Sequence, residues 1–156
     1  MINTTLCYIE QDGKYLMLHR IKKKHDPNEG KWIGVGGKLE PGETPEECLV
    51  REVREETNLE LDQYEKRGEV FFSAEGWEEE LMHLYTATKF HGQMTEECNE
   101  GELRWVPFQE IPSLPLWEGD RIFLADLLEG KKNIQLELYY QGDKLIRQVR
   151  KSTAGS

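Results

Sequence analysis

The sequence is poor in the features that would place it among secreted, zinc-binding or membrane proteins. Its three cysteines, Cys7, Cys48 and Cys98, are widely spaced and form neither a disulfide framework nor a zinc motif. No apolar run approaches the roughly 18 residues of a membrane-spanning helix. The N-terminus lacks the basic segment, apolar run and cleavage site of a signal peptide. We therefore expect a cytoplasmic protein with reduced thiols and no membrane partner.

Acidic residues outnumber basic residues in this chain. The chain has 20 basic against 30 acidic residues and a formal net charge of −10. This balance gives no general basic face for gripping phosphate backbones, so we expect no polymeric nucleic acid partner. The acid is unevenly spread, because residues 40–60 hold eight glutamates and only two arginines. One short segment thus supplies more than half of the negative excess.

The chain shows no internal repeat and no low-complexity linker. Its 156 residues, 37% of them hydrophobic, predict one domain over residues 1–151, with a small polar tail at 152–156. Strand-like and helix-like patterns follow one another in the order strands, helix, strands, helix, strands, which favours an α/β or α+β domain with a mixed sheet. Strands are expected at 5–11, 14–20, 68–76, 82–90 and 102–108, helices at 44–59 and 116–130, a loop at 22–31 and a hairpin at 133–151.

The acidic segment carries strong helix signals. Thr44 is a natural N-cap, and Glu47 three residues later completes a capping box. Pro45 stands at the first helical position, where its missing N–H costs nothing. Asn58 can adopt the left-handed conformation that ends helices. The apolar stripe expected to face the sheet comprises Leu49, Val50 and Val53.

Three carboxylates occupy one face of this helix. Glu52, Glu55 and Glu56 have i, i+3, i+4 spacing, and like charges so placed destabilise a helix by about 0.2–0.5 kcal/mol. They form either a solvated acidic face or a site for a hard divalent cation such as Mg²⁺, which prefers oxygen ligands. The preceding glycines, in "GVGGK", allow a ligand to approach the backbone closely, which favours a site for a polyphosphate and its metal.

The stretch from Gly37 to Leu59 resembles the signature of the Nudix hydrolases. The matching positions are Gly37, Glu43, Arg51, Glu52, Val53, Glu55, Glu56 and Leu59, while Asn58 stands where the signature has its last glycine. Asn tolerates positive φ better than most residues, so the departure is mild. The resemblance implies an α/β/α sandwich with a mixed sheet between helices. It also implies hydrolysis of a diphosphate linked to another moiety, usually a nucleoside, with Mg²⁺ or Mn²⁺ as cofactor.

The resemblance also implies roles for individual residues. Metal ligands would be the carbonyl of Gly36 and the carboxylates of Glu52, Glu55, Glu56 and Glu100. Glu52 is the first candidate for the base that activates water, and Glu100 is the second. Glu102 competes with Glu100 for its role. Arg51 would pair with acids such as Glu43 and orient the loop against the helix.

Segments outside the signature resemble the MutT/MTH-type sanitising enzymes. Those enzymes hydrolyse oxidised purine nucleoside triphosphates, notably 8-oxo-dGTP, to the monophosphate and pyrophosphate. By this resemblance Trp117 would stack on the base, Asp120 would bind its edge and Phe72 would form a wall. Further substrate contacts are expected from Arg20, Gly36, Gly37 and Lys38.

Two positions depart from the mammalian-type enzymes. Ile33 replaces an asparagine, and Gly119 replaces the first of two adjacent acids, so the mammalian mode of base reading does not carry over. Two alternatives stay open: hydrolysis of another nucleoside diphosphate derivative, such as ADP-ribose or a dinucleoside polyphosphate, and a non-catalytic nucleotide-binding module. The expected partner in each case is a small-molecule nucleotide. The sequence leaves open whether the protein is a monomer or a homodimer.

Overall fold

The computed structural model describes residues 1–22 and 28–151. The predicted loop at 22–31 lies partly outside these residues, and the predicted tail at 152–156 wholly outside them. The described part forms one mixed sheet of ten strands. The strands are β1 (Ile2–Gln11), β2 (Lys14–Arg20), β3 (Trp32–Ile33), β4 (Val35–Lys38), β5 (Glu60–Ala74), β6 (Glu80–His91), β7 (Glu97–Cys98), β8 (Gly101–Pro107), β9 (Ile134–Gln141) and β10 (Lys144–Arg150).

The sheet is mixed because two of its pairs are parallel. Its main path runs β10-β9-β5-β6-β1-β2-β8-β7, with β3 beside β2 and β4 beside β1. The parallel pairs are β1 with β6 and β5 with β9, while the other pairs are antiparallel. This arrangement confirms the predicted mixed sheet. It also places β4, which carries Gly36 and the signature glycine Gly37, directly against β1.

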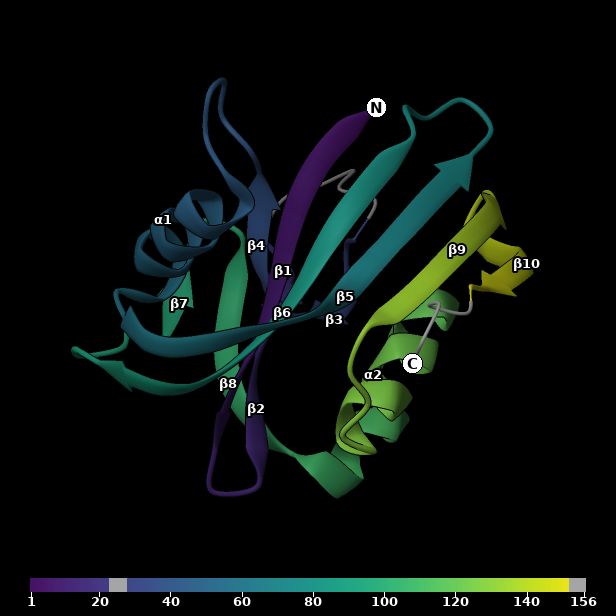
Figure 1. The fold of residues 1–156 in the computed structure, drawn as a ribbon. Helices are drawn as coiled ribbons and strands as arrows, with labels where there is room; N and C mark the ends of the chain where they lie inside the picture. The colour runs from purple at the N-terminus through teal and green to yellow at the C-terminus, as the bar shows by residue number, and fades with distance from the viewer. Residues whose placement is uncertain (23–27, 152–156) are drawn as a thin grey trace.

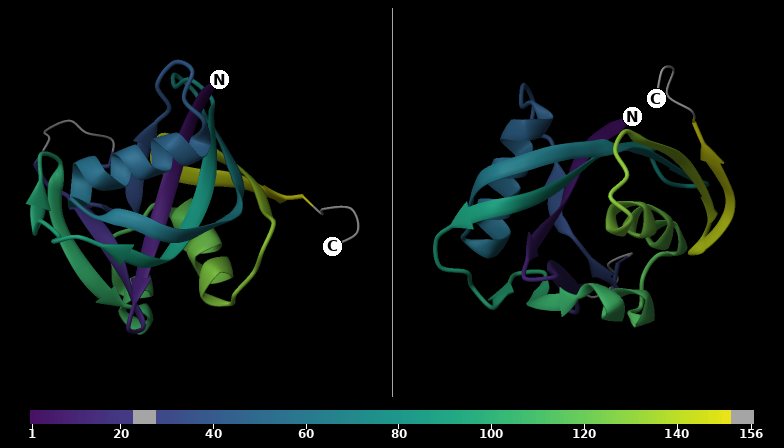
Figure 2. Two further views of the ribbon diagram at one scale, coloured as in Figure 1. Left: turned by 60° about the vertical axis from the view of Figure 1, so that its left-hand side comes forward. Right: turned by 60° about the horizontal axis from the view of Figure 1, so that its bottom comes forward.

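Two helices cover opposite sides of the sheet. Figures 1 and 2 show α1 (Pro45–Thr57) on one side of the β5–β6–β1 ribbon and α2 (Glu118–Leu128) on the other. Side chains alternate along β1 between two apolar clusters. Leu6 and Tyr8 pack with α2 in what we call the α2-side core, and Cys7 and Ile9 pack with α1 in the α1-side core. The sheet lies between helices, as the resemblance implied.

Helix α1 has the caps that its sequence predicts. The Thr44 hydroxyl accepts from the Glu47 N–H at 3.1 Å, and the Glu47 carboxylate accepts from the Thr44 N–H at 2.9 Å. Asn58 ends the helix with φ of 67°. The predicted stripe is corrected at one position, because Cys48 is fully buried while Val50 is only half-buried.

The largest differences from the predicted elements lie at β5 and at the segment that follows β8. Strand β5 begins at Glu60 rather than at residue 68, and its polar first half is paired with β6 through several register shifts. Such bulges break the period of two that marks a strand in a sequence. A 3₁₀ helix, η1 (Phe108–Ser113), was not predicted and leads from β8 toward α2. Within the described ranges, no helix is long and apolar enough to cross a membrane.

Candidate active site

Arg51 is the centre of the polar network on α1. Its Nε and Nη2 donate to the two carboxylate oxygens of Glu43 at 2.7 and 2.9 Å. Its Nη1 donates to Glu52 at 2.9 Å and to Glu55 at 3.2 Å, and Nη2 also donates to the Lys38 carbonyl at 3.1 Å. The pairing with Glu43 is the contact that the sequence led us to expect. One guanidinium therefore ties the loop before α1 to two of its carboxylates.

The Glu43 carboxylate is held in its charged form. Hydrogen bonds from Arg51 lower the pKa of Glu43 to about 2, and the backbone N–H of Glu40 also donates to this carboxylate. A carboxylate that stays ionised is a permanent partner for the guanidinium. The bidentate pair therefore fixes the loop through geometry as well as charge. Lys38 is exposed, and its carbonyl rather than its ammonium group contacts this network.

Four other carboxylates lie close enough to influence one another. Glu56 is buried and accepts a hydrogen bond from the Gly36 N–H at 3.1 Å. Burial raises the pKa of Glu56 well above its ordinary value, and the charges of Glu100 and Glu52 raise it further. The pKa of Glu52 is also raised, first by burial, with Glu55 and Glu100 contributing. The site is therefore rich in negative charge, which a cation would stabilise.

Glu100 reaches this site from the turn between β7 and β8. It precedes β8, and Arg20 at the end of β2 donates to it at 3.2 Å. Glu102 lies within β8, paired with His19, and is exposed. Of the two competing acids, Glu100 is therefore the one that the fold brings close to Glu52 and Glu56.

Gly36 and Gly37 are required by close packing inside the protein. A Cβ on Gly37 would lie 2.6 Å from the Glu52 carboxylate, and one on Gly36 would lie 2.0 Å from the Thr5 carbonyl oxygen. The two glycines allow β4 to lie against β1 with the Glu52 carboxylate pressed on its backbone. The sequence suggested glycines that admit a ligand. The structure shows that the absence of a Cβ at these glycines makes room for strand β1 and for the Glu52 carboxylate.

The donor set fits a hard divalent cation in its chemistry, since it consists of carboxylate oxygens and backbone carbonyls. In the described residues, however, no three His, Cys, Asp or Glu side chains are already grouped for a metal. The carboxylates lie apart because three of them are held by arginines: Arg51 donates to Glu52 and Glu55, and Arg20 donates to Glu100. Repulsion between carboxylates also keeps them apart. A cation would have to draw them together.

A second group of predicted residues lies at the start of α2. Trp117 is the N-cap, and its Nε1 donates to Asn28 Oδ1 at 2.7 Å. The Lys31 ammonium lies 4.8 Å from the centroid of the indole, and the Tyr140 ring meets it edge-on at 5.5 Å. The indole is thus fixed in orientation by one hydrogen bond and two ring contacts. Asn28 and Lys31 were not predicted, because nothing in their local sequence points to Trp117.

Asp120 is a buried acid near this indole. It is 6% exposed, and none of the hydrogen bonds in the described part of the chain reaches its carboxyl group. Burial, together with the charge of Glu80, raises the pKa of Asp120 to about 7, and the charge of Lys31 opposes the rise. Within the described residues, the Tyr8 hydroxyl is the side-chain polar atom that is fully buried without a partner, so the Asp120 oxygens keep a small accessible surface. A ligand that reaches this surface could hydrogen-bond the Asp120 carboxyl group.

The packing around Gly119 and Ile33 shows how the two departures noted in the sequence are accommodated. A Cβ at Gly119 would lie 2.5 Å from the Tyr140 hydroxyl, which accepts from the Gly119 N–H at 2.7 Å, so no acid fits there. Ile33 packs in the α1-side core, on the other side of the sheet from α2. Phe72 lies in the α2-side core and stacks on Tyr140 with centroids 6.5 Å apart. Phe72 and Trp117 therefore contact the same tyrosine.

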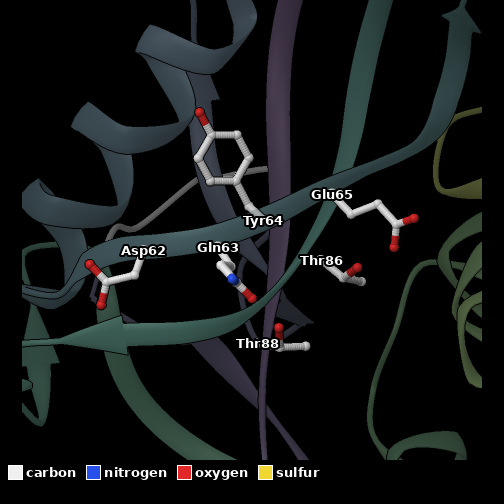
Figure 3. A pocket seen from close by; sticks show the side chains of 6 residues that line it. All are labelled: Asp62, Gln63, Tyr64, Glu65, Thr86 and Thr88. Atoms are coloured by element: carbon white, nitrogen blue, oxygen red, sulfur yellow. The ribbon is translucent and has the colours of Figure 1, made fainter.

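A separate hollow of about 570 Å³ lies on β5 and β6, and Figure 3 shows its lining. The lining residues are Asp62, Gln63, Tyr64, Glu65, Thr86 and Thr88. None of them belongs to either group described above, and the hollow follows the register shifts of β5. The chemistry therefore points to the carboxylates of α1 and the start of α2 rather than to this hollow.

Comparisons with known proteins agree with this geometry. Residues 2–127 match the family model described as the NUDIX domain. The chain is 36% identical over 111 residues to the mouse oxidized purine nucleoside triphosphate hydrolase, covering 70% of each chain. It is 30% identical over 131 residues to an uncharacterized Nudix hydrolase, YvcI, of Bacillus subtilis, covering 81% of this chain and 79% of the relative. The structure of a MutT protein from Bacillus halodurans superposes with a TM-score of 0.87 at 26% identity, covering 96% of this chain and 97% of that one.

Proposed function

This chain belongs to the Nudix family as a MutT-type hydrolase of pyrophosphate bonds, and we propose that it acts on purine nucleoside triphosphates. The preferred substrates in this proposal are oxidised purines such as 8-oxo-dGTP, and the products are the nucleoside monophosphate and pyrophosphate. The resemblance to the mouse enzyme, whose name states that activity, supports the proposal. Sanitising the nucleotide pool would be the biological result.

The observation that carries the proposal is the unpartnered Asp120 carboxyl group near Trp117. An indole fixed by Asn28 and Tyr140 offers an aromatic face for a base, and stacking of this kind is worth about 1–3 kcal/mol. Asp120 supplies a hydrogen-bonding group for the edge of the same base. Phe72, which stacks on Tyr140, is the proposed wall. An aromatic face beside a polar group that lacks a partner matches the chemistry of a purine.

The proposed hydrolytic centre consists of the α1 carboxylates. Nudix hydrolases use divalent metal ions, typically Mg²⁺. Here the carbonyl of Gly36 and the carboxylates of Glu52, Glu55, Glu56 and Glu100 would hold Mg²⁺, with Mn²⁺ as a substitute. A bound cation of this type lowers the pKa of a water molecule and neutralises phosphate oxygens.

Each protein group then has a proposed task. Glu52 takes the proton from the attacking water, because its carboxylate is fixed between Arg51 and Gly37. Glu100 is the alternative base. Arg51 and Glu43 act as positioning residues that hold the loop against α1. Arg20 and the backbone and side chain of Lys38 would meet the phosphates.

A panel of nucleotides in Mg²⁺ tests the proposal. We expect 8-oxo-dGTP to be hydrolysed with a higher kcat/KM than dGTP, and pyrophosphate rather than orthophosphate to be released. The panel should include ADP-ribose, a dinucleoside polyphosphate and a pyrimidine triphosphate. Fast turnover of ADP-ribose, with 8-oxo-dGTP no better than dGTP, would replace the proposal by the alternative of another diphosphate substrate. A catalytically silent protein that still binds nucleotide would favour the binding module.

A further inference from the structure

Glu80 stands on the same face of the sheet as the proposed base-binding residues. It opens β6, where it pairs with Phe72 of β5 and with Ile2 of β1. Directly paired residues point their side chains to the same face of a sheet. Phe72 packs in the α2-side core, so the Glu80 side chain also lies on the α2 side. Figure 1 shows this end of β6 beside β1 and β5.

A buried threonine fixes the Glu80 carboxylate. Thr4 of β1, which is 8% exposed, donates from its hydroxyl to Glu80 Oε2 at 2.7 Å. The residues that the structure describes make no hydrogen bond to the other oxygen, Oε1. One oxygen is therefore held in place while the other keeps its full capacity to accept. This is the arrangement of a group that is pre-oriented for a ligand.

Glu80 also acts directly on Asp120. After burial, its charge is the next-largest influence that raises the pKa of Asp120, so the two acids lie near enough to interact although they are 40 positions apart in sequence. Neither acid is neutralised by a described ion pair, although Lys31 acts on Asp120 from the Trp117 side. Packing against Tyr140 excludes a second acid at Gly119 on α2. The fold supplies a second acid near the proposed base-binding residues from β6 instead, in the form of Glu80.

We propose that Glu80, positioned by Thr4, is a specificity-determining residue that accepts hydrogen bonds from the 2-amino side of a guanine-type base bound between Trp117 and Asp120. This inference rests on the proposed function. A guanine-type base has two adjacent donors, N1–H and the 2-amino group, which suit a pair of acidic side chains. An adenine-type edge places an acceptor beside its donor and leaves one acid unmatched. Glu80 therefore selects the base, and it does so independently of oxidation at the imidazole ring.

The test uses dGTP and dITP, which differ by the 2-amino group alone. We expect wild-type kcat/KM to be about 10-fold or more higher for dGTP, since losing one hydrogen bond to a charged group has an effect of this order. In Glu80→Leu the ratio should fall to about 1, mainly through KM for dGTP, while kcat for dITP is kept. Glu80→Gln keeps a neutral acceptor oxygen and should give a ratio between those of Glu80→Leu and the wild type. Thr4→Val should give an intermediate ratio, because the carboxylate remains but is no longer positioned. Glu79→Gln, an exposed neighbour with the same change in charge, is the matched control and should keep the wild-type ratio.

A binding measurement separates this inference from the proposed function. Dissociation constants of dGMP and dIMP, measured by calorimetry, need no catalysis. Tighter binding of dGMP that Glu80→Leu abolishes supports Glu80 even if the wild-type protein hydrolyses no triphosphate. Equal binding of both nucleotides by the wild type, or a preference that survives in Glu80→Gln and Glu80→Leu with unchanged melting temperatures, overturns the inference.

Discussion

Arg51 donates two hydrogen bonds to Glu43, from Nε and Nη2 to the two oxygens of its carboxylate. The two residues lie eight positions apart and join a loop to a helix. The geometry needs a planar fork, which a lysine lacks. Because Arg51 also bonds Glu52, any shift of the pair moves the candidate base.

Arg51→Lys should therefore lower kcat strongly while the melting temperature of the protein changes little. The charge is kept and the bidentate geometry is lost, and a displacement of about 1 Å at a catalytic group can cost about 100-fold in rate. Steady-state kinetics with saturating nucleotide and Mg²⁺ give the result. Arg54→Lys on the same helix, where Arg54 pairs with Glu60 and is 55% exposed, is the control and should keep full activity. Equal losses in the two variants would mean that Arg51 acts only through the stability of the helix.

Glu56→Gln should abolish the response of the protein to Mg²⁺. We expect the wild-type melting temperature to rise with Mg²⁺, because a ligand at 100 times its Kd stabilises by about 2.7 kcal/mol. The variant removes a buried carboxylate, so its melting temperature should not respond, and its turnover should fall by about 100-fold or more. Glu110→Gln, at an exposed site, should behave as wild type. Full Mg²⁺-dependent turnover in Glu56→Gln would remove this residue from the ligand set.

Trp117→Leu should weaken nucleotide binding with little change in kcat. Loss of stacking worth about 1–3 kcal/mol corresponds to roughly a 5- to 150-fold rise in KM. Trp77→Leu removes a tryptophan that is 63% exposed in the β5–β6 loop and is a matched control. A KM that stays the same in Trp117→Leu would show that the indole only packs against Tyr140 and Lys31.

Asp120 makes the stability of the protein depend on pH in an unusual direction. Burial, with the charge of Glu80, raises the pKa of Asp120 from 3.8 to about 7, while Lys31 opposes the rise. The folded state therefore binds this proton more tightly than the unfolded state. Its favourable contribution is complete below pH 4 and declines as pH rises to about 7.

Asp120→Asn should remove this decline. The free energy of unfolding of the variant, relative to wild type, should increase between pH 4 and pH 7, at about 1.4 kcal/mol per unit of pKa shift. Denaturant titrations at several pH values measure it. The charged or titratable groups that act on Asp120, namely Glu80, Lys31, Tyr8 and Tyr140, stay in place in both proteins. A difference that does not vary with pH would contradict the assigned pKa.

Some features of the site could be predicted because they depend on residues close in sequence. The caps of α1 and the i, i+3, i+4 face of Glu52, Glu55 and Glu56 follow from helical geometry alone. The helix at 44–59 and the hairpin at 133–151 were accordingly predicted, while the mixed sheet followed from the order of the elements and from the family resemblance. The early start of β5 was not, because bulges disturb its alternation, and β6 rather than local propensity holds this polar half as a strand.

The sequence by itself determined which side chains α1 presents and with what spacing, since each contact that forms the helix spans four residues or fewer. Only the tertiary structure decided which residues from distant parts of the chain contact one another around the site. The ion pair of Glu100 with Arg20, the Thr4–Glu80 hydrogen bond and the packing of Gly119 on Tyr140 join residues 80, 76 and 21 positions apart. Strand order and register bring these residues together, and neither is encoded in any local pattern.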